Sequence, residues 1–199
     1  MKKNVLNATK KGYIFIIMQN KIKTMPSVQQ GCQMDEAMKR WLKTGELPTV
    51  LENVKISEHF SMKEMLHSET ALKYGIKNEP ETPDEAEMVK KNLVAICNQI
   101  LEPLREYMQQ PIYINSAYRC KKLNNILHSS SPTSKHLSGA AVDIRISSVE
   151  QMNKMIGFIR TIEFDQLIIE RNKNGGRWLH VSYNRTGKNR KQILNINVK

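Results

Sequence analysis

The sequence predicts an α+β domain in which helices pack on an antiparallel sheet. Apolar residues up to about residue 104 recur with the 3.6-residue period of helices, whereas short apolar runs separated by turn signals follow after residue 111. Helices that precede a set of strands, rather than alternating with them, are typical of this fold class. Hydrophobic residues make up 40% of the chain and charged residues 25%, which is the composition of a globular protein with a core.

The chain of 199 residues has room for one ordinary domain and an extension. Residues 1–50 are basic and lack a helical period, so we expect a partly flexible extension with a short helix at residues 35–43. Residues 51–199 form the predicted domain. The apolar run at residues 13–18 is shorter than the apolar core of roughly 7–15 residues that a secretory signal peptide contains. No stretch approaches the ~20 apolar residues of a membrane span, so we expect no transmembrane segment.

Capping residues mark the start of three predicted helices. Ser61 is followed three residues later by Glu64, which is a capping box. Thr82 precedes Pro83, a residue favoured in the first helical turn, and Ser148 begins the third helix. The second helix is the longest, and we expect Pro103 to kink it near its end. Its apolar residues are Ala86, Val89, Leu93, Ile96, Cys97, Ile100, Leu101 and Leu104.

Four segments read as strands: residues 111–115, 140–146, 164–170 and 178–183. The last two are joined by Asn-Lys-Asn-Gly-Gly at residues 172–176, which is typical of a hairpin turn. We therefore expect the final pair of strands to lie side by side and antiparallel.

The net charge of +12 suggests a polyanionic partner, which is nucleic acid, an anionic membrane or an anionic cell wall. Nucleic acid is the least favoured, because the sequence shows no helix-turn-helix or zinc-finger spacing and only 6% aromatic residues to stack on bases. The three cysteines, Cys32, Cys97 and Cys120, are widely spaced and form no CxxC pair, which argues against a cysteine zinc site.

Two histidines and an aspartate have the pattern of a catalytic Zn²⁺ site. His136 precedes a turn at Gly139, and Asp143 lies in the strand that follows, so the chain can fold back and bring their side chains together. His180 lies in the middle of a later strand. Three nitrogen and oxygen ligands that leave a fourth position open are the catalytic zinc arrangement. Such an ion lowers the pKa of bound water to ~7 and polarises a carbonyl.

Glu170 is the predicted general base. If the hairpin pairs symmetrically about its Asn-Gly-Gly tip, Glu170 lies directly opposite His180, with Cβ atoms about 5 Å apart. Strand alternation places Gln166 on the same face, where we expect it to contact substrate. In an alternative interpretation, Glu170 pairs with Arg171 or Arg177 at the hairpin surface.

Arg119 follows the first predicted strand and is a candidate to contact substrate. Its guanidinium would bind a substrate carboxylate or stabilise the developing oxyanion. The alternative is a structural salt bridge. Ser116 and Ser134 are candidate hydrogen-bond donors to the substrate.

Several motifs, taken in order, resemble the M15 family of zinc peptidases, which includes D-Ala-D-Ala carboxypeptidases and phage endolysin peptidases. They include Ser116-Ala-Tyr-Arg119, Ser134-Lys-His136-Leu-Ser-Gly139, Phe164-Asp-Gln-Leu-Ile-Ile-Glu170 and Trp178-Leu-His180-Val-Ser. The resemblance covers roughly residues 56–190 and is greatest to the phage and prophage branch.

This resemblance implies a small α+β fold shared with D-Ala-D-Ala peptidases and hedgehog signalling domains. It also implies zinc ligation by His136, Asp143 and His180, and a substrate contact from Arg119. One departure concerns the catalytic acid, which several relatives carry three positions before the last histidine. That position is Arg177 here, so the base must come from elsewhere, and Glu170 is the natural substitute.

The sequence therefore predicts zinc-dependent hydrolysis of peptide bonds in bacterial peptidoglycan, with a stem peptide or a cross-link as substrate. We expect a monomer that acts on the cell wall, and release at lysis would suit a phage-encoded enzyme. The alternative function is a zinc-containing wall-binding or phage structural module without turnover. The absence of an acid at Arg177 supports that alternative.

Overall fold

The computed structural model describes residues 54–127 and 131–198. The expected extension at residues 1–50, with its helix at residues 35–43, lies outside the described residues. The helical elements in chain order are α3 (Met62–Leu66), α4 (Glu69–Lys73), α5 (Pro83–Ile96), the π turn η1 (Cys97–Leu101), α6 (Glu102–Met108), α7 (Lys121–Ile126), the 3₁₀ turn η2 (Lys135–Ser138) and α8 (Val149–Ile159). The strands are β1 (Ile114–Ser116), β2 (Ala141–Arg145), β3 (Gln166–Asn172), β4 (Arg177–Ser182) and β5 (Gln192–Val198).

The three predicted helix caps are confirmed. The side-chain oxygens of Ser61, Thr82 and Ser148 each accept a hydrogen bond from the backbone N–H three residues later. The helix that Ser61 begins is short, because Ser68 caps a separate helix α4 soon after it. Leu72 on α4 is 66% exposed and therefore lies outside the core.

The long helix departs from α geometry ahead of Pro103 and not at it. Residues Cys97–Leu101 form a π turn in which the backbone N–H of Glu102 donates to the Cys97 carbonyl, and α6 continues from there. Proline has no N–H to give to the carbonyl four residues earlier, and its ring crowds that carbonyl. A π turn just before it relieves this crowding within the helix.

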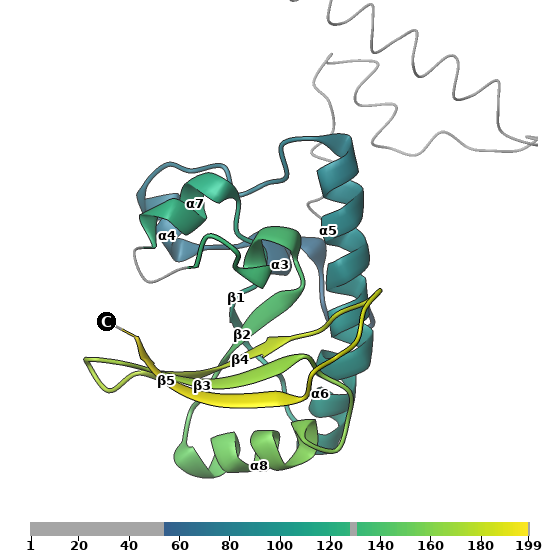
Figure 1. Cartoon of the computed structure of the whole chain (residues 1–199), viewed down its shortest axis with the longest axis vertical. Coiled ribbons are helices and arrows are strands. Elements are labelled where there is room, and N and C mark those ends of the chain that lie inside the picture. Colours follow the sequence, from purple (N-terminus) through teal and green to yellow (C-terminus); the bar gives the residue numbers. More distant parts are fainter. Residues whose placement is uncertain (1–53, 128–130, 199) are drawn as a thin grey trace, which may run out of the picture. The chain divides into compact units, whose positions relative to one another are not determined.

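The sheet has the strand order β1-β2-β4-β3-β5. The pairs β1/β2, β2/β4 and β3/β4 are antiparallel, as expected. β5 was not predicted, and it pairs with β3 in parallel, so the sheet is mixed. The α+β class is confirmed. Figure 1 shows α8 below the β3/β4/β5 part of the sheet, with α3, α4 and α7 above it.

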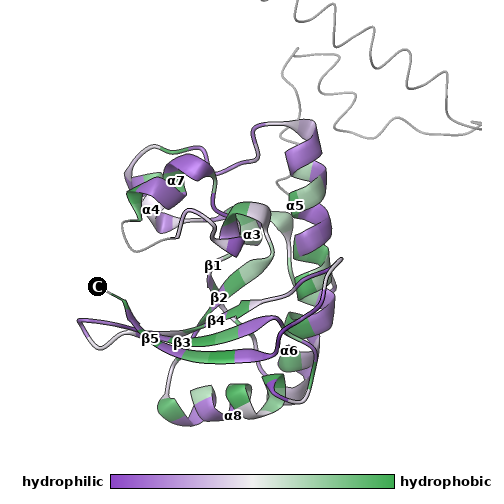
Figure 2. Ribbon diagram, in the orientation of Figure 1, coloured by the Kyte–Doolittle hydropathy of each residue, from purple (hydrophilic) through white to green (hydrophobic). Residues whose placement is uncertain are grey.

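The core lies between the helices and the sheet. Four methionines of α3 and α8 are buried, namely Met62, Met65, Met152 and Met155. Cys97 is buried too, and this burial raises the pKa of its thiol to about 12, as suits a structural residue. In Figure 2 hydrophobic residues alternate with hydrophilic ones along α5, α8 and the strands. None of the described helices is long and apolar enough to cross a membrane.

Candidate functional site

Three elements carry the predicted metal ligands to one place. His136 lies in η2, Asp143 in the middle of β2 and His180 in the middle of β4. β2 and β4 are neighbours, and Asp143 pairs directly with His180, so both side chains project from the same face.

Gly139 makes the turn that brings His136 to this face. It ends η2 with φ +70°, in the left-handed region that favours glycine, and its N–H donates to the His136 carbonyl. A Cβ atom at this position would lie 3.0 Å from the Val89 carbonyl oxygen and 3.2 Å from the Leu93 side chain. Glycine is therefore required by conformation and by the close approach of α5.

The candidate ligand atoms form a nearly equilateral triangle. His136 Nε2 lies 3.2 Å from both Asp143 Oδ1 and His180 Nδ1, and the last two atoms are 3.0 Å apart. Zinc bonds of 2.0–2.1 Å in tetrahedral geometry would separate two ligands by about 3.3 Å. The triangle therefore fits Zn²⁺ closely. Among the described residues, these three make up the group of histidine, cysteine and acidic side chains able to hold a metal.

The tautomer of His136 is fixed by its second ring nitrogen. Nδ1 lies 2.5 Å from the Ala117 carbonyl oxygen, to which it can only donate, so the proton is on Nδ1 and Nε2 keeps its lone pair. Burial lowers the pKa of His136 and outweighs the opposing effect of Asp143. The neutral imidazole that results is the form that binds metals.

Asp143 uses its two oxygens for different partners. Oδ1 faces the two histidines, whereas Oδ2 accepts a hydrogen bond from the Arg119 guanidinium. Burial alone would raise the pKa of Asp143, but His136, His180 and Arg119 together hold it well below its usual range. Asp143 is therefore a carboxylate throughout the physiological range.

Arg119 and Ser116 form a support for this carboxylate. The Arg119 side chain is 13% exposed, its Nε donates to Ser116 Oγ at 2.8 Å, and its backbone N–H donates to the His136 carbonyl. The expected alternative of a structural salt bridge is thus present. Ser116 orients Arg119, and it is not among the residues that line the pocket described next.

A pocket of about 870 Å³ opens in front of the triad. Besides the three candidate ligands, it is lined by the predicted residues Arg119, Ser134, Gln166 and Glu170. Seven of the eight residues predicted for the site therefore surround one cavity.

Glu170 does not lie opposite His180, as the sequence suggested. Ile168 takes that position, and Glu170 pairs with Trp178. The Asn172 side chain accepts hydrogen bonds from the backbone N–H groups of Asn174 and Gly176 within the loop. The hairpin is therefore centred on Asn174 and not on the glycines.

The changed register keeps Glu170 on the face of the metal candidates. A two-residue change preserves the face of every side chain, so Glu170 becomes a diagonal neighbour of His180, about 7–8 Å away and somewhat closer between the Cβ atoms. Burial, followed by the charge of Asp143, raises the pKa of Glu170. Arg171 and Arg177 oppose each other in register, and alternation places both on the other face.

Sequence reasoning missed a buried carboxylate beside the pocket. Asp165 is fully buried and binds Lys135 Nζ at 2.7 Å and Arg190 through Nε and Nη2 at 2.8 and 2.7 Å. Hydrogen bonds from Arg190, then from Lys135, hold the pKa of Asp165 well below its usual range despite its burial. Lys135 and Arg190 both line the pocket. They are distant from Asp165 in sequence, so no local sequence pattern predicts that the three residues come together.

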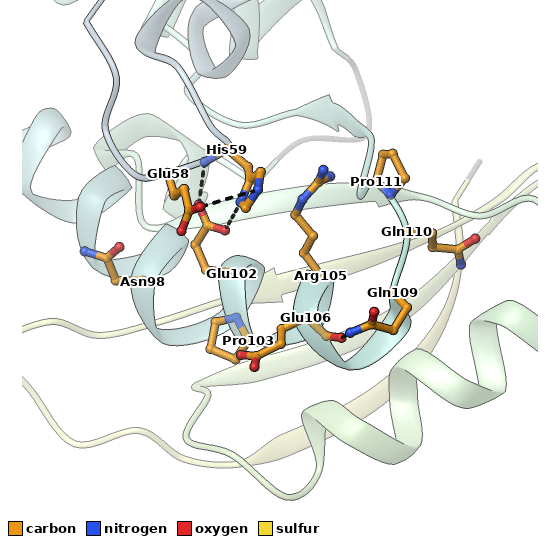
Figure 3. A pocket seen from close by; sticks show the side chains of 10 residues that line it. All are labelled: Glu58, His59, Asn98, Glu102, Pro103, Arg105, Glu106, Gln109, Gln110 and Pro111. Atoms are coloured by element: carbon orange, nitrogen blue, oxygen red, sulfur yellow. Dashed lines mark hydrogen bonds and ion pairs between the residues drawn. The ribbon is translucent and has the colours of Figure 1, made fainter.

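A second cavity, of about 600 Å³, contains another histidine–carboxylate pair (Figure 3). The ring of His59 lies 2.8 Å from one oxygen of Glu102, and its backbone N–H donates to the other oxygen at 2.8 Å. These two hydrogen bonds hold the segment before α3 against α6. Among the described residues, the group with metal-ligand geometry does not include His59.

A family model described as Peptidase M15 matches residues 58–182, which is more than half of the chain. The match includes the three candidate ligands and Glu170, and it ends before β5. A comparison with curated proteins gives no match.

Proposed function

Because this chain belongs to the M15 family of peptidases, we propose that it hydrolyses peptide bonds in bacterial peptidoglycan with the help of a zinc ion. The observation that carries the proposal is the triangle of His136, Asp143 and His180, with sides of 3.0–3.2 Å, at the wall of a pocket that also contains a carboxylate. The family supplies the reaction class, and the triangle supplies a place for the catalytic ion.

His136, Asp143 and His180 would hold the zinc ion. Bound there, Zn²⁺ would lower the pKa of a water molecule and polarise the scissile carbonyl. The charge of Asp143 is maintained by Arg119, and the Ala117 carbonyl keeps the correct nitrogen of His136 available. The supporting contacts thus favour ligation over protonation.

Glu170 is the proposed general base. Its carboxylate would take a proton from the attacking water and later deliver it to the nitrogen of the leaving amine. The raised pKa of Glu170 suits both steps, since a carboxyl group with a higher pKa is a stronger base and still donates to an amine. Its position at the pocket wall supports this role.

Arg119, Ser134 and Gln166 are the proposed substrate contacts. Arg119 lines the pocket while its guanidinium holds Asp143, so it can serve the carboxylate and the substrate together. Gln166 donates to Gln192 on the neighbouring strand, which leaves its carbonyl oxygen available to a peptide N–H. Ser116 acts through Arg119.

The net charge of +12 favours approach to the anionic cell wall. This steering weakens as salt screens the charges, so hydrolysis of intact murein is expected to fall with ionic strength more steeply than hydrolysis of a short neutral peptide. A stem peptide or a cross-link is the proposed substrate, and the protein is proposed to act as a monomer.

The test is mass analysis of purified murein after digestion by the full-length protein, with added zinc and with a chelator. We expect new amino termini and shortened peptides that disappear on chelation and return when zinc is restored. Glu170→Gln should retain zinc and lose the products. A zinc-loaded protein that binds murein but releases nothing would instead establish the non-catalytic wall-binding module.

A further inference from the structure

The C-terminal strand β5 lines the candidate active-site pocket although it lies outside the family match. Ile196, Asn197 and Val198 contribute to the lining, whereas the match ends at residue 182. The beginning of this strand is firmly held. The N–H groups of Lys191 and Gln192 donate to the backbone carbonyls of Phe164 and Asp165, and Arg190 binds the buried Asp165 side chain.

The register of β5 places Ile196 beside Glu170. The two residues are paired in the parallel β3/β5 ladder, and paired residues project from the same face. The side-chain hydrogen bond between Gln166 and Gln192, an equivalent pair earlier in the ladder, confirms that the faces coincide. Glu170 therefore lies between Trp178 on β4 and Ile196 on β5.

Ile196 is a large apolar residue left 40% exposed at the edge of a pocket. A ligand that covered it with an apolar group would remove that surface from water, which is favourable. An acidic group placed there would lose water and approach the carboxylate of Glu170, which is unfavourable. The surroundings therefore favour an apolar group over an acidic one.

We propose that Ile196 is a specificity-determining residue which, with Trp178, forms a subsite for an uncharged apolar side chain of the substrate peptide next to Glu170. This inference rests on the proposed peptidase function. It adds to that function a preference at one position of the substrate, and it assigns the preference to a strand outside the family match.

Ile193 provides a matched control on the same strand. It is 42% exposed, almost the same as Ile196. It pairs with Leu167, whose side chain is buried on the opposite face of the sheet, and it is not among the pocket residues. The same substitution at Ile193 therefore changes the polarity of the strand and of its exposed surface to the same extent as at Ile196, but it leaves the pocket lining unaltered.

The experiment compares zinc-loaded full-length wild type, Ile196→Lys and Ile193→Lys on synthetic stem peptides. The peptides carry alanine or glutamate at each position flanking the bond cleaved in murein, and kcat/KM is measured for each. We expect wild type to prefer alanine by about 10-fold or more at one flanking position. Ile196→Lys should reduce this preference by about 10-fold, partly by cleaving the glutamate peptide faster, because its ammonium group attracts the acidic side chain.

Ile193→Lys should keep the wild-type preference within about 2-fold, since its ammonium lies on the other face. A gain on the glutamate peptide has no explanation in misfolding, so it separates recognition from stability. Equal effects of the two substitutions, or a wild type indifferent to alanine and glutamate, would overturn the subsite while leaving the peptidase intact. If zinc-loaded wild type cleaved none of these peptides and no murein, the proposed function would fail and the subsite with it.

Discussion

Two pockets in the described part of this molecule each hold a histidine at hydrogen-bonding distance from a carboxylate, and one of the two has the arrangement of a metal centre. In the pocket at α6, the His59 side chain is 41% exposed and lies 2.8 Å from the carboxylate of Glu102 and 3.9 Å from that of Glu58. In the triad, His136 is 2% exposed, His180 11% and Asp143 7%, and atoms of three side chains converge. The comparison teaches that a short histidine–carboxylate contact alone does not indicate a metal site. What distinguishes the candidate metal site from a structural hydrogen-bonded pair is that three ligand atoms converge and that their side chains are buried.

The largest difference between the two regions should appear on removal of a histidine. His180→Ala is expected to abolish stoichiometric zinc binding and to lower kcat/KM on murein peptides by about 10³-fold or more, because it removes a proposed ligand of the proposed catalytic ion. Zinc content by elemental analysis and product release would measure both effects.

His59→Gln is the control for that change. It should retain zinc and lower activity by less than about 2-fold, because His59 lies in the other cavity. Loss of metal in His59→Gln, or its retention in His180→Ala, would contradict the assignment of the two regions.

The next effect concerns the carboxylates of the two cavities. Glu170→Gln should lower kcat by about 10²–10⁴-fold with zinc content unchanged, as expected for loss of a general base. Glu106→Gln, in the cavity of His59, should leave kcat close to that of wild type. Steady-state kinetics of both variants on the same peptide would measure this difference. A Glu170→Gln enzyme with wild-type kcat would show that Glu170 is not the general base.

Asp165 extends the comparison to stability. Asp165→Asn is expected to lower the free energy of unfolding by about 2 kcal/mol near neutral pH, because the neutral amide binds the partly exposed cations of Lys135 and Arg190 less strongly than the buried carboxylate does. The folded-state pKa of Asp165 lies below its ordinary value of 3.8. This stabilisation is therefore complete above about pH 4 and is lost as the pH falls through the folded-state value.

Denaturant titrations of wild type and Asp165→Asn from pH 7 down to pH 2.5 would measure this difference. Glu163→Gln is the matched control, since Glu163 pairs with Lys191 at 2.7 Å at the exposed surface. It should cost less than about 0.5 kcal/mol. A gap between wild type and Asp165→Asn that stayed constant to pH 2.5 would show that the charge of Asp165 is not the cause.

The smallest effect is expected for the His59–Glu102 hydrogen-bonded pair at α6. Glu102→Gln should cost about 1 kcal/mol of stability, because it weakens two hydrogen bonds at a partly exposed position, and it should leave activity unchanged. Thermal unfolding and murein hydrolysis would be measured on the same sample. A large loss of hydrolysis would mean that the α6 cavity takes part in catalysis.

What the sequence predicts well is local. The caps at Ser61, Thr82 and Ser148 depend on residues within one helical turn, and His136 and Asp143 are joined by a short turn at Gly139. The hairpin register was predicted incorrectly, because the side chain of Asn172 closes the loop around Asn174. Several similar turns are compatible with the composition of this loop, so the composition alone does not determine the hairpin register.

What the sequence does not reveal depends on distant partners. β5 pairs with β3 on one side only and carries Asn195 and Asn197 among its apolar residues, so its sequence shows only a weak strand periodicity. Asp165 meets Lys135 and Arg190 only in the folded chain. The role of Ser116 was likewise hidden, since a hydroxyl near a site can face the substrate or, as here, an arginine.

The contact between Gly139 and α5 links a helix core to the chemistry of the pocket. Val89 and Leu93 lie against the backbone of Gly139, and that backbone sets the position of η2. Enlarging Val89 would push on the turn that carries His136, at a residue that touches neither ion nor substrate. Because Val89 is itself buried in the core, such a substitution should distort the candidate metal site and lower the stability of the fold together.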